Sequence, residues 1–96
     1  MGDWPRRKKD SAAEIEHLTQ TINEQSEEER KILGSFSKAM NNFATDRSLE
    51  TCLDALNLSM QLSNIRSKLA QSYEYYARSL EQEIITLRRS SDPNQG

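Results

Sequence analysis

The sequence is poor in the residues that fix sharp turns and cross-links. It contains one cysteine, two prolines and three glycines in 96 residues, and only Gly34 lies well inside the chain. The single Cys52 excludes an internal disulfide and favours a reducing compartment, so we expect a cytoplasmic protein. No run of about 18 apolar residues is present, which argues against a membrane-spanning helix. Between Pro5 and Pro93 no residue forces the chain out of a helix.

Apolar residues are also scarce. They make up 34% of the chain, against the roughly 45–50% of an average soluble domain. Charged residues make up 29%, with both signs mixed and a net charge of −2. A chain this short and polar has little material for a core of its own. We therefore expect an elongated fold or burial against a partner.

The first half of the chain carries a heptad-like apolar pattern. Ser11 and Glu14 form a capping-box sequence, which predicts that a helix begins at residue 11. Apolar residues then recur in steps of three and four to about residue 45, with the polar residues Gln25 and Glu29 in the middle. Residues 1–10 are expected to form a disordered basic tail. The predicted interaction seam of this helix comprises Ile15, Leu18, Ile22, Ile32, Phe36 and Phe43.

The pattern loses its phase after Phe43. A break at 45–48 would explain this, since Asp46 or Ser48 can cap a new helix, although a bent continuous helix is the competing interpretation. The second helix is predicted over 48–90, with a flexible tail at 91–96. Its stripe approaches an eleven-residue repeat, which suits a nearly straight helix. This predicted seam comprises Leu58, Leu62, Ile65, Leu69, Tyr73, Tyr76, Leu80, Ile84 and Leu87.

The first half of the second helix has a broader apolar arc. Leu53, Leu56 and Met60 lie beside the stripe, so we expect this half to contact more than one neighbour. The predicted fold is therefore all-α, with two long antiparallel helices in a coiled-coil-like hairpin. Such a pair has one seam and no enclosed core, so it should complete a bundle by oligomerisation or by binding a partner.

No catalytic or cofactor motif is present. The single His17 and Cys52 would lie at opposite ends of the hairpin, and the chain has no Gly-rich phosphate loop, Cys-x-x-Cys or Gly-x-Ser-x-Gly sequence. Glu14-x-x-His17 matches a fragment of di-iron helical bundles, but Ile15 and Leu18 define the seam and leave this pair on its flanks. We expect no enzyme, no cofactor and no small-molecule substrate. A metal-binding four-helix bundle is the third interpretation.

The N-terminal segment combines a tryptophan with four cations. These residues suit contact with an anionic lipid surface, where the tryptophan could sit at the headgroup level. A solubilising tail and a nuclear-import signal are the alternatives. The pI near 5.4 and the lack of other basic clusters indicate no nucleic-acid binding. The candidate membrane or partner contact comprises Trp4, Arg6, Arg7, Lys8 and Lys9.

Residues 29–87 resemble part of a BAR domain of the sorting-nexin type. The resemblance is carried by Gly34-Ser35-Phe36, Phe43-Ala44, Leu69-Ala70 and Leu80-x-x-x-Ile84. It implies a long helical hairpin, dimerisation and a role in membrane trafficking. The chain departs from the family in holding two of its three helices and in being mildly acidic.

The sequence thus predicts a non-enzymatic protein–protein assembly module, an adaptor or scaffold of intracellular complexes. Its partner would be a second copy or a helical subunit. The alternative is a BAR-like peripheral membrane protein that uses the basic N-terminal segment.

Overall fold

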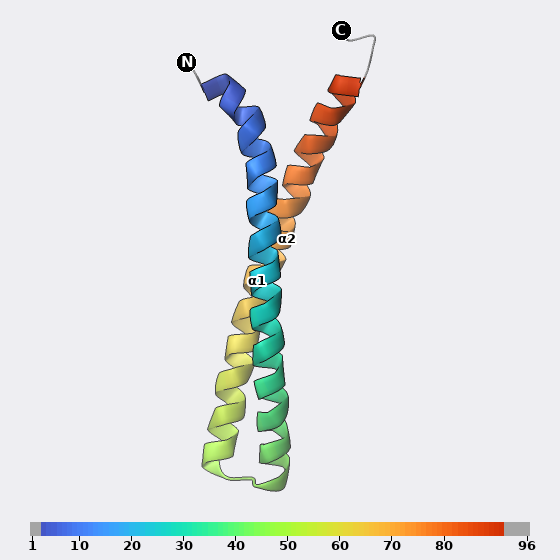
Figure 1. Ribbon diagram of the computed structural model, residues 1–96. Coiled ribbons are helices and arrows are strands. Elements are labelled where there is room, and N and C mark those ends of the chain that lie inside the picture. Colours follow the sequence, from blue (N-terminus) through green and yellow to red (C-terminus); the bar gives the residue numbers. More distant parts are fainter. Residues whose placement is uncertain (1–2, 92–96) are drawn as a thin grey trace. The chain divides into compact units, whose positions relative to one another are not determined.

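The computed structural model describes residues 3–91, which form two long α-helices (Figure 1). Helix α1 spans Asp3–Thr45 and helix α2 spans Leu49–Ser91, each 43 residues long. The helices pack against each other as a hairpin, so the predicted all-α fold class is confirmed. Neither helix, over its described residues, is long and apolar enough to cross a membrane.

The hairpin divides into two compact units. The terminal unit contains residues 3–22 of α1 and 71–91 of α2, and the turn unit contains residues 23–70. In the turn unit, the two helices run side by side on either side of the connecting turn (Figure 1). Each unit is described separately below.

Helix α1 begins at Asp3, well before the predicted start at Ser11. The segment expected to be a disordered tail is therefore helical from residue 3, and Ser11 lies inside the helix rather than at its cap. Pro5 does not prevent this, because the first backbone N–H groups of a helix have no intrahelical acceptor and a proline loses no bond there. At the other end, α2 includes Ser91, and the rest of the expected C-terminal tail, 92–96, lies outside the described residues.

The break between the helices lies at 46–48, as predicted. Side-chain hydrogen bonds cap the start of α2 at this break. The Ser48 hydroxyl accepts a hydrogen bond from the Thr51 backbone N–H at 3.2 Å, and the Ser48 backbone N–H donates to the Thr51 hydroxyl at 3.2 Å. This reciprocal pair is a capping box with threonine in the place of glutamate. No described residue has a positive φ, so the turn needs no glycine. The competing interpretation of one bent helix is wrong.

Candidate interaction surfaces

The inner face of the turn unit contains all of the buried apolar side chains among the described residues. Leu62, Ile65 and Leu69 of α2 are 5%, 3% and 5% exposed, and Ala39 of α1 is 6% exposed. Phe36 is half-buried. These positions follow steps of three and four, the spacing that keeps one face of a helix against one partner. The predicted seam residues half-buried on the two helices of this unit are Ile32, Phe36, Phe43 and Leu58.

The polar gap in the α1 seam is occupied by an ion pair to α2. Glu29 is half-buried on the inner face, and its Oε2 lies 2.9 Å from Nε of Arg66. The side chains of Glu29 and Arg66 remain 30% and 55% exposed, so water screens the pair and its contribution to stability is about 1 kcal/mol or less. The pair links one position of α1 to one of α2, which suits a role in fixing the register of the two helices.

A second apolar stripe of the turn unit faces away from this inner face. Its four residues lie on α2 in steps of four, three and four, and they are 77%, 53%, 55% and 60% exposed. We call them the turn stripe: Leu49, Leu53, Leu56 and Met60. Helix α1 does not cover these side chains. The sequence had indicated the stripe, because apolar residues form a broad arc on the first half of the second helix.

In the terminal unit, two small polar residues, Ser72 and Ser79, are buried on the inner face of α2. The steps of three and four continue through Ser72, Tyr76, Ser79 and Glu83, which are buried or half-buried. Opposite them, the predicted seam residues of α1 are half-buried. They are Ile15, Leu18 and Ile22. Sequence reasoning missed the inner serines because it followed the large apolar residues; the unbroken spacing from Ser48 onward was the signal that could have found them.

Four large apolar residues of α2 in the terminal unit lie on its outside. Tyr73, Leu80, Ile84 and Leu87 are 52%, 39%, 51% and 57% exposed, and the small Ala77 lies exposed between them. We call these five residues the terminal stripe. The predicted nine-residue seam of α2 is therefore divided: Leu58, Leu62, Ile65, Leu69 and Tyr76 face α1, whereas the other four seam residues do not.

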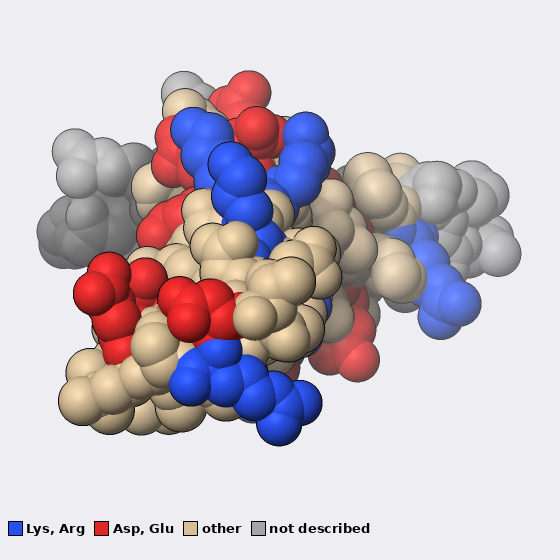
Figure 2. Space-filling model, turned by 90° about the horizontal axis from the view of Figure 1, so that it is seen from below, with Lys and Arg blue, Asp and Glu red and all other residues tan. Residues whose placement is uncertain are grey.

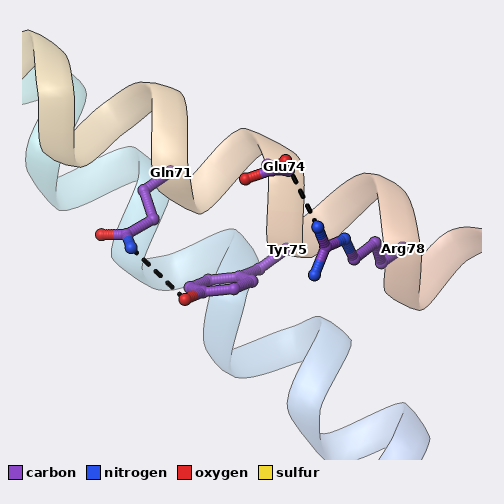
Figure 3. Close-up of polar contacts among 4 residues, drawn as sticks. All are labelled: Gln71, Glu74, Tyr75 and Arg78. Atoms are coloured by element: carbon purple, nitrogen blue, oxygen red, sulfur yellow. Dashed lines mark hydrogen bonds and ion pairs between the residues drawn. The ribbon is translucent and has the colours of Figure 1, made fainter.

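An open groove of about 310 Å³ lies in the terminal unit. Three α1 residues line one side, Glu14, His17 and Leu18. On α2, the Tyr75 hydroxyl accepts a hydrogen bond from the Gln71 amide at 3.3 Å, and Arg78 lies 3.4 Å from the Glu74 carboxylate (Figure 3).

Polar and charged side chains lie around this groove. No cluster of three or more His, Cys, Asp or Glu side chains that could hold a metal occurs in the part of the chain that the structure describes. Glu14 and His17 are both exposed, as their flanking positions had predicted. The guanidinium of Arg78 is directed to its neighbour Glu74 on the same helix (Figure 3). The groove therefore combines the exposed polar side chains Glu14 and His17 with the apolar side chain of Leu18.

Charge of both signs is present on the face of the molecule drawn in Figure 2. Seen from below in Figure 2, Lys and Arg side chains alternate with Asp and Glu side chains, and uncharged surface separates them. The candidate contact residues Trp4, Arg6, Arg7, Lys8 and Lys9 belong to the first turns of α1, and their side chains lie outside the described part of the structure.

No protein-family model, curated protein or solved structure matches this chain. The two uncovered apolar stripes of α2 are accordingly the features from which a function can be inferred.

Proposed function

We propose that this protein is a non-enzymatic helical interaction module that buries exposed apolar stripes of α2 against helices of another chain. The observation that carries the proposal is the turn stripe. Its four large aliphatic side chains, Leu49, Leu53, Leu56 and Met60, are each more than half exposed on a helix whose opposite face is packed.

The spacing of the turn stripe indicates the kind of partner. Steps of four, three and four place the four side chains along one line of α2, so that a helix laid against it would contact each in turn. Contiguous exposed apolar patches of this kind mark interaction surfaces in soluble proteins. A scaffold or adaptor role in intracellular complexes is the role we propose for such a surface, and the lone exposed Cys52 suits a reducing compartment.

The expected strength of the contact can be estimated from burial. Full burial of a leucine-sized side chain contributes about 1.5–3 kcal/mol, so covering the exposed half of one contributes about 1 kcal/mol. Four such side chains give a gross contribution of about 4 kcal/mol before the entropy of association is subtracted. The stripe therefore supports a moderate, reversible contact unless the partner adds further interactions.

The double substitution Leu53→Gln/Leu56→Gln tests the proposal. Both side chains are about half exposed, so the hairpin should keep its helix content by circular dichroism. Affinity capture with the wild-type chain as bait, followed by quantitative mass spectrometry, should identify a protein whose recovery falls roughly tenfold or more in the variant, since about 1.4 kcal/mol corresponds to a factor of ten.

A matched control is Asn64→Gln/Lys68→Gln, two exposed polar positions of α2 in the same unit. This variant should capture the same proteins as the wild type. Equal recovery of every captured protein by the wild type and the leucine double variant, together with an unchanged mass in solution, would show that the turn stripe binds nothing and would refute the proposal.

A second candidate function is BAR-like binding to an anionic membrane surface. It is supported by the four cations beside Trp4, which the structure includes in the first turns of α1, and by the resemblance of residues 29–87 to that family. Co-sedimentation with vesicles that contain anionic lipid tests it. Binding that disappears when residues 1–9 are removed supports the candidate, whereas equal sedimentation of both chains, or none, contradicts it.

A further inference from the structure

The terminal stripe has the same alternating spacing as the turn stripe and is one step longer. Tyr73, Ala77, Leu80, Ile84 and Leu87 follow steps of four, three, four and three, the spacing of a two-heptad coiled-coil seam. The inner face of the same segment carries the buried Ser72 and Ser79 and the half-buried Tyr76 and Glu83. This segment of α2 therefore has two complete helix-facing seams, one occupied and one exposed.

The residues beside the terminal stripe indicate what could cover it. Glu74, Glu81 and Arg88 lie along one flank, and Tyr76 and Glu83 lie along the other. In a parallel pair of such seams, a residue of one flank meets the opposite flank of the partner about five positions later. Two copies of this chain would then place Glu83 of each beside Arg88 of the other, which is a pair of opposite charges.

The antiparallel arrangement of the same two seams is less favourable. Here each flank faces the same flank of the other copy. Glu74 of one chain would then lie near Glu81 of the other, twice by symmetry, and like charges at these positions disfavour the pairing. In the other antiparallel register Glu74 would face Arg88, but Glu81 and Glu83 would each face their own copy. The parallel arrangement is thus the one that places no like charges across the seam.

We propose that a second copy of this chain binds along the terminal stripe, with the two α2 helices parallel and in register. The inference rests on the proposed function and specifies one partner for one of its surfaces. A two-fold axis along the seam would bring each stripe residue against its own copy, as in an isologous interface. The seam is only about 21 Å long at 1.5 Å per residue, so the interface is small and we expect a dissociation constant in the micromolar range.

Cysteine cross-linking tests both the partner and the orientation. In a Cys52→Ser background, Ile84→Cys places one thiol in the seam. As the control, Gln82→Cys places one at an exposed position on the other side of α2, where it lines the open groove beside α1. Ile84 is half exposed, so the change leaves the inner packing untouched. Paired seam thiols have an effective concentration on the order of 1 mM, so in a glutathione redox buffer, at a protein concentration of tens of micromolar, Ile84→Cys should give at least about tenfold more covalent dimer than Gln82→Cys.

A mixture of two cysteine variants shows whether the two α2 helices are parallel or antiparallel. An equimolar mixture of Tyr73→Cys and Ile84→Cys should yield the two homodimers if the helices are parallel. Enrichment of the mixed Tyr73→Cys–Ile84→Cys dimer would establish the antiparallel arrangement and overturn the proposal, as would equal cross-linking of Ile84→Cys and Gln82→Cys. A wild-type chain that stays monomeric by light scattering at high micromolar concentration also overturns it. The proposed function would still stand if the turn-stripe variant had lost a captured protein.

Charge reversal gives an independent check. Glu83→Arg and Arg88→Glu should each reduce Ile84→Cys cross-linking, because each places like charges across the parallel seam. The double reversal Glu83→Arg/Arg88→Glu should restore it. Failure of the double variant to recover would contradict the contact between Glu83 and Arg88 of the two copies.

Discussion

Replacement of Ile65 by alanine should destabilise the hairpin far more than the same replacement of Ile84. Ile65 is 3% exposed and lies between the buried Leu62 and Leu69, whereas Ile84 is 51% exposed. Truncation of a buried isoleucine to alanine costs about 2–5 kcal/mol. We expect the lower half of this range, about 2–3 kcal/mol, because half-buried side chains such as Phe36 can shift to fill part of the space.

The matched substitution Ile84→Ala tests burial with identical chemistry. It should change the free energy of unfolding by less than about 0.5 kcal/mol, since the side chain is half exposed and alanine has the higher helix propensity. Thermal unfolding followed by far-UV circular dichroism, at low micromolar concentration to limit self-association, measures both. Ile65→Ala should lower Tm by roughly 10–20 °C, from about 4–8 °C per kcal/mol for a domain of this size.

The smaller truncation Ile65→Val should lower the free energy of unfolding by about 0.5–1.5 kcal/mol. Its effect should lie between those of Ile84→Ala and Ile65→Ala. Equal losses for Ile65→Ala and Ile84→Ala would refute the division of α2 into an inner face and an outer stripe. A larger loss for Ile84→Ala at low concentration would show that the terminal stripe, rather than the serine-lined face, packs against α1.

Three further outcomes are expected. Ser48→Ala should lower stability by about 1 kcal/mol in thermal unfolding because the α2 cap is lost, and Ser48→Asp should retain most of it. Arg66→Ala should cost about 1 kcal/mol or less, and a comparison at low and high salt should show the difference shrinking as the exposed pair with Glu29 is screened. Leu53→Gln/Leu56→Gln should leave Tm within a few degrees of wild type while reducing binding of a hydrophobic fluorescent dye; undiminished dye binding would mean that the turn stripe is not the accessible apolar surface.

The hairpin could be predicted from the sequence because local signals agree with the tertiary structure. The loss of apolar phase after Phe43 and the capping residue Ser48 both indicate a break at 46–48, and the structure has it there. The start of α1 could not be placed in the same way. Ser11 and Glu14 satisfy a capping pattern, but nothing between Asp3 and Ser11 ends a helix, so the pattern lies in the helix interior.

The packing of the terminal unit could not be read from the apolar series alone. After Leu69 the large residues move one position off the inner spacing, to Tyr73 and Leu80, while Ser72 and Ser79 take the places that face α1. A single sequence does not show which of two neighbouring seams pairs within the chain and which is left outside. The predicted interaction seam therefore combined Tyr73, Leu80, Ile84 and Leu87 with the residues that face α1. Only their exposure in the structure separates the two groups.

The concentration of the buried apolar side chains in the turn unit has a kinetic consequence. That unit contains Ala39 on α1 and Leu62, Ile65 and Leu69 on α2. The three-residue connection 46–48 joins the two helices there. Contacts across a short loop carry a small closure entropy, so we expect folding to begin at the turn and proceed toward the chain ends. In native-state hydrogen exchange, the amides of the serine-lined terminal unit would then exchange first, through local fraying of the helix ends. The amides around Ile65 would exchange only through global unfolding. A partner that covers the terminal stripe would slow that fraying, so complex formation could be followed as protection of the α2 amides in this unit.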